Sequence, residues 1–187
     1  MTTQNLVDKK KLKNPPLELH YLGDRVLRQS TKRISRVDNE IRQLARQMLQ
    51  TMYSSDGIGL AGPQVAVHKQ IIVVDCEPDE AAKPPMVLIN PVITGFSQQL
   101  CVAQEGCLSI PKVFLDVVRP TAIEVSYKDE NGRPQKLQAT DFLARVIQHE
   151  IDHLTGVMFV DRVENKIALD QELGKHGFAV KAVQPVG

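Results

Sequence analysis

The sequence predicts an α+β fold in which small antiparallel sheets pack around a central helix near the C-terminal end, and three observations support this. Short β-rich runs bounded by Pro, Gly or polar residues recur between residues 71 and 127. An Asn-Gly turn signal at 131–132 leads from the run at 123–127 into a short polar run at 135–139. The strongest helical pattern follows at once, from about residue 140 to Gly156.

The chain of 187 residues fits one domain. Residues 1–16 are polar and Lys-rich and end in Pro-Pro, so we expect a flexible N-terminal tail. We expect residues 17–187 to form the single domain. After Asp161 the sequence is charged and weakly periodic, which predicts a peripheral C-terminal arm.

The elements follow in order along the chain. Asp38 is a suitable N-cap for a helix over residues 38–52, where apolar residues recur mostly at steps of three and four. Strands are predicted at 71–74, 86–89, 100–103, 113–118, 123–127 and, after the turn, 135–139. The helix at 140–156 places four residues along one face, which are Phe142, Val146, His149 and His153.

The composition is that of an ordinary globular protein, with 42% hydrophobic and 24% charged residues and a formal net charge of +1. No apolar leader precedes the fold and three cysteines cannot all pair, so we expect a reducing cytoplasm. We expect no stable nucleic-acid or membrane binding. The locally basic stretches at 9–13 and 25–36 favour solvated surface, with a transient ribosome contact as the alternative.

The most informative motif is H-E-I-D-H at residues 149–153. On a helix, His149 and His153 lie on one face, about 5–6 Å apart at Cβ, which is near enough to share a cation. Glu150 lies about 100° further round the helix and so addresses the water on the metal. The pattern is typical of metal hydrolases; two surface histidines are the alternative.

A catalytic ion usually has three protein ligands and one water, so a third ligand is required. A metzincin would place a histidine where this chain has Phe159, and a thermolysin-like protease would use Glu164 or Glu172. Cys107 is the better candidate, because its Gly-flanked segment at 105–111 predicts a turn and not a regular strand. The other two cysteines, Cys76 and Cys101, adjoin apolar runs and are predicted to be small buried hydrophobes.

The run G-I-G-L-A-G at residues 57–62 matches the dinucleotide fingerprint, but its context does not. A helix is predicted before it, where a strand is required, and Pro63 interrupts the region where a phosphate-binding helix would start. The glycines could instead let the backbone approach an extended peptide, with the Gln64 amide facing a reacting carbonyl. A plain loop is the alternative.

Three segments taken together resemble the ordered motifs of peptide deformylase: G-I-G-L-A-G-P-Q at 57–64, E-G-C-L-S at 105–109 and Q-H-E-I-D-H at 148–153. Order and spacing agree from about residue 17 to 160. Gly62 stands where many members have a second alanine. The resemblance implies a metal-dependent hydrolase that removes the N-formyl group from the initiator methionine of nascent polypeptides and releases formate.

The resemblance also implies the roles of individual residues. One divalent metal ion would be held by Cys107, His149 and His153. Glu150 would be the general base, while Gln64 and the Leu108 backbone N–H would face the developing oxyanion.

For the N-formyl-Met substrate, the resemblance implies that Gly59 helps to bind the peptide in an extended conformation. The methionine pocket would use Ile58, Phe142, Val146 and the side of His149, with Arg145 at a position that is aliphatic in some relatives.

The ligand set of one thiolate and two imidazoles tolerates Fe(II), Zn(II), Ni(II) or Co(II). The resemblance implies Fe(II), with zinc as the chief alternative. Two other hypotheses stay open: a structural metal site closed by a fourth protein ligand, and a thiol hydrolase in which Cys107 is the nucleophile.

Overall fold

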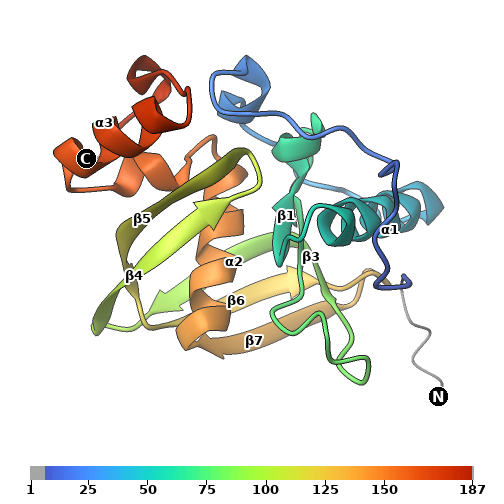
Figure 1. Ribbon diagram of the computed structural model, residues 1–187. Coiled ribbons are helices and arrows are strands. Elements are labelled where there is room, and N and C mark those ends of the chain that lie inside the picture. Colours follow the sequence, from blue (N-terminus) through green and yellow to red (C-terminus); the bar gives the residue numbers. More distant parts are fainter. Residues whose placement is uncertain (1–6, 187) are drawn as a thin grey trace.

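A computed structural model describes residues 7–186, and it confirms the α+β prediction. Its helices are α1 Asn39–Ser54, α2 Asp141–His153 and α3 Lys166–Lys175. Its strands are β1 Gly59–Ala61, β2 Ile71–Val74, β3 Met86–Phe96, β4 Leu100–Cys107, β5 Ile110–Pro120, β6 Ala122–Lys128 and β7 Pro134–Thr140. They form two antiparallel sheets, one with the order β1-β2-β3-β6-β7 and one made of the β4–β5 hairpin (Figure 1).

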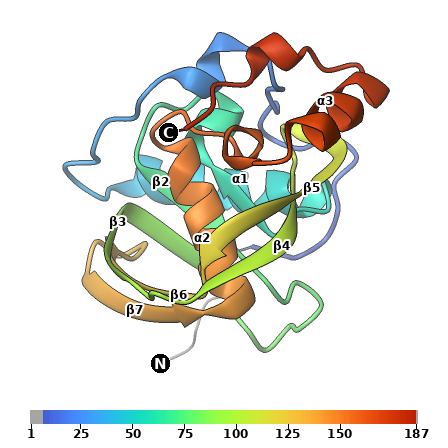
Figure 2. The ribbon, with the colours of Figure 1, turned by 90° about the vertical axis from the view of Figure 1, so that its left-hand side faces the viewer.

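Helix α2 lies between the two sheets, as Figures 1 and 2 show. It packs against β1, β2, β6 and β7 of the larger sheet and against β5 of the hairpin. Residues 144–150, nearly two full turns, are all buried, because protein lies on both sides of the helix. The histidine motif therefore lies in the interior of the molecule.

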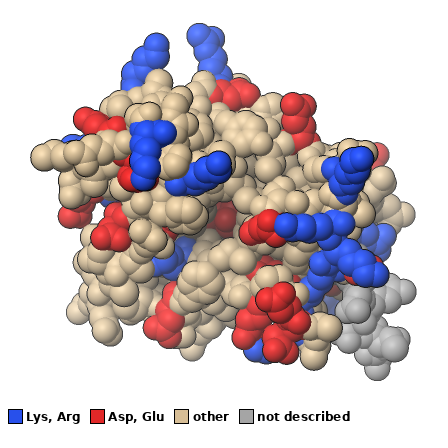
Figure 3. Space-filling model, in the orientation of Figure 1, with Lys and Arg blue, Asp and Glu red and all other residues tan. Residues whose placement is uncertain are grey.

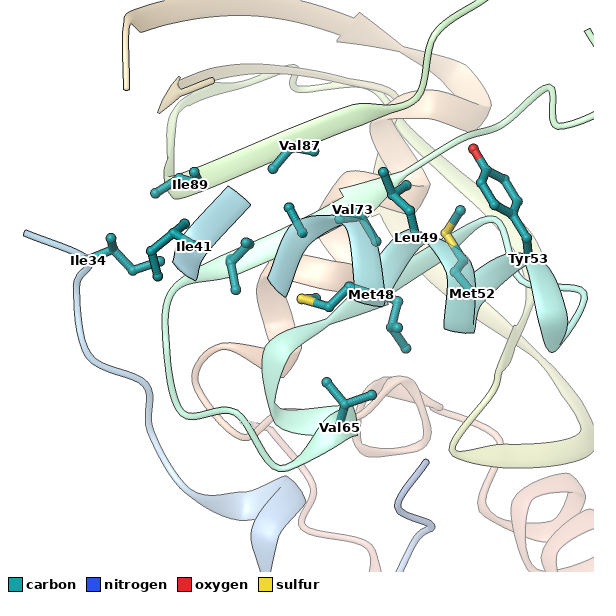
Figure 4. Packing of buried hydrophobic residues seen from close by; sticks show 13 residues of the cluster. Ile34, Ile41, Met48, Leu49, Met52, Tyr53, Val65, Val73, Val87 and Ile89 are labelled. Atoms are coloured by element: carbon teal, nitrogen blue, oxygen red, sulfur yellow. The ribbon is translucent and has the colours of Figure 1, made fainter. Parts of the chain in front are cut away.

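The larger sheet is covered on both faces at β2, where all four residues are buried. Successive side chains of a strand point to opposite faces. Ile71 and Val73 pack with Met48 and Met52 of α1 (Figure 4). Ile72 and Val74 pack in a second cluster with residues of α2. This arrangement explains why the β2 sequence is continuously apolar instead of alternating.

Both predicted helices begin within one residue of their predicted starts. The Asp38 side chain accepts a hydrogen bond from the Ile41 N–H at 3.1 Å, and Thr140 is the N-cap of α2. The α-helix ends at His153, and Gly156 has a φ of 77° in the turn that follows. A Cβ at Gly156 would lie 2.7 Å from the Arg28 carbonyl oxygen, so both the dihedral and the packing require glycine.

The predicted strands are all present, and several are longer than their apolar runs. Two elements were not predicted. Strand β1 has three residues within the glycine-rich run, and among the described residues it pairs with β2 alone. Helix α3 lies in the predicted C-terminal arm, and its Leu169 and Leu173 are buried against β5 residues (Figure 1).

Two cysteine predictions were wrong. Cys107 is the last residue of β4 instead of a turn residue, because pairing with β5 extends the strand through a register shift after Glu105. Cys101 is exposed, because the start of β4 lies at the surface, whereas Cys76 is half-buried.

Residues 7–16 make several contacts with the remainder of the chain. The Lys9 ammonium lies 2.8 Å from the buried Asp75 carboxylate and also donates to two backbone carbonyls, and the Leu12 N–H donates to Ser54. The division into a tail and a single catalytic domain stays a prediction, and residues 1–6 lie outside the described residues.

Charged side chains of both signs are interspersed over the face in Figure 3. Within residues 7–186, none of the helices has the length and apolarity needed to cross a bilayer.

Candidate metal centre

The two sheets and α2 bring three potential metal ligands together. His149 and His153 lie one turn apart on α2, and Cys107 approaches them from the end of β4. One ligand atom from each residue lies within 4.8 Å of the other two, and Cys107 Sγ is 3.4 Å from His153 Nε2. The cysteine and histidines that were predicted from separate motifs therefore form one cluster.

The donor set fits a transition-metal ion. Bond lengths of about 2.0–2.1 Å to nitrogen and about 2.3 Å to sulfur place the donors of a tetrahedral site about 3.3–3.7 Å apart. The 3.4 Å between the Cys107 and His153 atoms falls within that range. Glu150 Oε2 and His153 Nδ1 are buried without a hydrogen-bond partner among the described residues. A polar group is missing from the surroundings of Glu150, and a hydrated ion would supply it.

The ring of His149 is held from both sides. Its Nδ1 lies 3.0 Å from Glu105 Oε2, so a proton on Nδ1 donated to that carboxylate leaves the Nε2 lone pair for a metal. The Phe159 ring stacks on it with centroids 5.9 Å apart. Phe159 occupies the position where a metzincin would have a ligand, and here it supports one.

Glu105 is itself held by two arginines. Arg119 donates to both of its oxygens at 2.5 and 2.9 Å, and Arg145 Nη1 donates to Oε1 at 2.8 Å. Arg119 also donates to Asp152, which Arg162 contacts from the other side. Sequence reasoning missed this network; the only signal was that Glu105 shares a motif with Cys107.

The pKa directions describe the field at the site. Burial opposes the charged form of Glu105, but hydrogen bonds from His149 and Arg119 hold its pKa well below its usual value. Burial also opposes the charged form of His149, yet the adjacent Cys107 sulfur and Glu105 raise the pKa of that ring well above its usual value. The Glu105 carboxylate and the Cys107 sulfur thus both lie against His149. Burial and the nearby charge of His149 lower the pKa of His153 well below its usual value, which favours the neutral form that binds metals.

Glu150 is 4% exposed and lies against Gly59 of β1. A Cβ at Gly59 would overlap the Glu150 carboxyl group, so the close approach of strand and helix requires glycine. Burial raises the pKa of Glu150 to about 7. A carboxylate with a pKa near neutrality is well matched to accepting and returning a proton at physiological pH.

Two hydrogen-bond donors face the same region. Gln64 is buried, and its Oε1 accepts from the Ala61 N–H at 2.8 Å, which turns Nε2 toward Cys107 Sγ at 3.4 Å and Ser109 Oγ at 3.2 Å. The Leu108 N–H lies in the turn between β4 and β5 and donates to no protein acceptor within residues 7–186. The segment at 20–22 holds Gln64 and the residue that follows Leu108, since the His20 N–H donates to the Gln64 carbonyl and the Leu22 N–H to the Ser109 carbonyl.

A cavity of about 750 Å³ opens beside the ligand cluster. All the predicted site residues line it except His153, which is fully buried behind them. They are Ile58, Gly59, Gln64, Cys107, Leu108, Phe142, Val146, His149 and Glu150. The structure adds residues that the sequence did not indicate, among them Leu19, Tyr21 and Phe114.

A family model for polypeptide deformylase matches residues 16–168, a range that includes all the residues above. The chain belongs to the peptide deformylase family. Peptide deformylases are metal-dependent hydrolases, and this one removes the N-formyl group from nascent polypeptides.

Three relatives illustrate the likeness. A peptide deformylase of Microchaete diplosiphon is 67% identical over 186 residues, which cover 100% of both chains. The crystal structure of a Synechococcus elongatus peptide deformylase in complex with actinonin has a TM-score of 0.95 and 66% identity, covering 96% of this chain and 98% of that one. A peptide deformylase of Acinetobacter baumannii with Met-Ala-Ser bound has a TM-score of 0.73 and 34% identity, covering 79% and 98%.

The other metal ligands, the closed structural site and the dinucleotide site that the sequence allowed do not match the structure. Neither Glu164 nor Glu172 is in the ligand cluster, and Glu172 contacts Lys175 and His176 on α3. Among the described residues, the cluster has three candidate ligands and no fourth, which opposes a closed structural site. The dinucleotide fingerprint is also rejected, because α1 precedes the glycines and a short 3₁₀ turn, Gly62–Val65, follows them.

Proposed function

We propose that Cys107, His149 and His153 hold one divalent ion, with Fe(II) as the working ion, and that Glu150 is the general base of the deformylation. The observation that carries the proposal is the position of Glu150. Its buried Oε2 atom has no hydrogen-bond partner among residues 7–186, and Glu150 lines the same cavity as Cys107 and His149. Fe(II) is proposed from the family resemblance, since one thiolate and two imidazoles also suit zinc, nickel and cobalt.

The substrate would be an N-formyl-Met peptide bound as an extended strand. Strand β1 is at the edge of its sheet, with β2 on one side only, so the other edge can pair with a peptide at Gly59. Ile58, Phe142 and Val146 would surround the methionine side chain. The relative with Met-Ala-Ser bound supports a peptide of this kind in the cavity.

A bound divalent ion supplies Lewis acidity and lowers the pKa of a coordinated water toward about 7. Glu150 would accept the proton that the attacking water loses as it adds to the formyl carbon. Gln64 Nε2 and the Leu108 N–H donate hydrogen bonds to the carbonyl oxygen as it becomes negative, which stabilises the transition state more than the flat ground state. Glu150 then passes the proton to the amine nitrogen as the C–N bond breaks, so formate and a free methionine amine leave.

We further propose a cytoplasmic enzyme that contacts the ribosome only transiently. Two lysines of the basic N-terminal stretch are engaged within the chain, Lys9 with Asp75 and Lys11 with Asp56. These ion pairs reduce the charge that this stretch offers to RNA.

Glu150→Ala tests the assignment of the base. We expect the variant to bind the metal stoichiometrically and to lose formate release from a formyl-Met peptide, measured anaerobically with each candidate ion and with elemental analysis. Glu172→Ala, on the outer helix α3, is the matched control and should retain full activity. If Glu150→Ala releases formate at the wild-type rate, Glu150 is not the base. A trapped acyl-enzyme on Cys107 would favour the thiol hydrolase instead.

A further inference from the structure

The helical wall of the proposed methionine pocket contains an arginine among its apolar residues. Phe142, Arg145, Val146 and His149 are spaced three and four apart on α2 and all line the cavity. Arg145 is only 8% exposed, so its guanidinium is buried in the same wall as the apolar side chains. Burying a charge costs free energy unless the charged group is paired and hydrogen-bonded.

Its partners account for most of the guanidinium. Nη1 donates to Glu105 Oε1 at 2.8 Å and to the Val117 carbonyl at 2.9 Å, and Nη2 donates to the Cys101 carbonyl at 2.7 Å. These bonds tie α2 to both strands of the hairpin. They also fix the plane of the guanidinium, because its geometry is rigid.

Among the described residues, two of its five N–H donors are left over, the Nε–H and one N–H of Nη2. Within residues 7–186, Arg145 Nε makes no hydrogen bond to a protein atom. The Nε atom is also not completely buried. Arg145 lines the cavity, so a molecule bound there lies beside the residue that carries these free donors. Arg119 differs: its Nε, Nη1 and Nη2 all donate to carboxylates, and it does not line the cavity.

We propose that Arg145 is a specificity-determining residue of the first-residue pocket, with its stem packing along the bound methionine and its Nε–H donating to the thioether sulfur. This proposal rests on the proposed pocket. A thioether is a weak acceptor, whereas the methylene of norleucine, an otherwise similar side chain, accepts nothing. Norleucine would displace solvent from the Nε–H and leave the donor unpaired, which carries a penalty that methionine avoids.

The test compares kcat/KM for formyl-Met-Ala-Ser and formyl-norleucine-Ala-Ser. Because a thioether is a weak acceptor, we expect the wild-type enzyme to prefer methionine by about 3- to 10-fold. Arg145→Lys retains the charge beside Glu105 but removes the planar Nε–H, and the preference should fall to about 1. Arg119→Lys is the matched control: it weakens the same carboxylate clamp outside the cavity, so it should lower both rates equally and leave the ratio unchanged.

Competition by the product peptides Met-Ala-Ser and norleucine-Ala-Ser gives the same ratio from binding if a variant is too slow to assay. An unchanged ratio in Arg145→Lys, or a wild-type ratio of 1, overturns the role of Arg145. A failure of the pocket itself has a different signature: the wild-type enzyme would then cleave formyl-Ala-Ala-Ser as well as formyl-Met-Ala-Ser.

Discussion

Adding one methyl group at Gly59 should displace the proposed base without touching any metal ligand. The new Cβ of Gly59→Ala would lie 2.8 Å from Glu150 Cδ and 2.9 Å from Cγ, with Oε1 nearer still, whereas ordinary contact begins at 3.4 Å. The carboxyl carbon must therefore retreat by at least 0.6 Å, the difference between 3.4 and 2.8 Å. A misplacement on the order of 1 Å can cost about 10²-fold, so we expect kcat to fall by about 10- to 100-fold.

The assay is formate release under saturating formyl-Met-Ala-Ser, with the metal content of each sample measured in parallel. Gly174→Ala is the matched control, because that glycine lies in α3 with no atom within 4 Å of the added Cβ. The control should keep its activity and be slightly more stable, as alanine is the better helix former. If Gly59→Ala binds metal and retains kcat within threefold of the wild type, the close approach of β1 to Glu150 does not position the base.

Three further predictions concern stability. Lys9→Met removes the cation beside the buried Asp75 carboxylate, to which Tyr53 and the Glu77 N–H still donate. The loss should cost about 2 kcal/mol, which lowers Tm by about 4–8 °C. Lys10→Met is the control, because its side chain is 82% exposed, and it should change nothing measurable. In Gly156→Ala, the new Cβ sits on a left-handed φ of 77° and also clashes with a backbone carbonyl. Gly177→Ala is the control, because Gly177 has the same φ but no atom within 4 Å of the added Cβ. The denaturation midpoint should therefore fall further in Gly156→Ala than in Gly177→Ala. An ion present at about 1,000 times its Kd stabilises the folded state by about 4 kcal/mol. Removing it with a chelator should therefore lower Tm by about 8–16 °C. An unchanged Tm would show that the ion does not bind to the folded state.

Local patterns were sufficient to predict the helices and most strands. The cap at Asp38, the turn at 131–132 and the glycine at 156 act within a few residues, so their effects can be inferred from sequence. The two histidines of the metal motif are also local, being one helical turn apart. For these elements, tertiary packing agrees with the local preference.

Features that depend on pairing across the fold were missed. Cys107 was placed in a turn because its flanking residues favour one, but the strand there exists only through its pairing with β5. The Glu105 clamp joins residues 14 and 40 positions apart, and no periodicity links them. Strand β1 has only three residues and lies in the glycine-rich run, so its local sequence does not predict a strand. It forms because it pairs with β2, and its Gly59 lies against the Glu150 carboxylate.

The three thiols of the chain occupy very different surroundings. Cys101 is open to solvent, Cys76 is half-buried with its pKa raised to about 11 by burial and by Asp75, and Cys107 belongs to the ligand cluster. Alkylating reagents therefore meet one fast site that is independent of the ion, one slow site, and one that ligation would protect. Mass spectrometry of a partly alkylated sample would report the fraction of loaded enzyme directly, with Cys101 as the internal standard in every molecule.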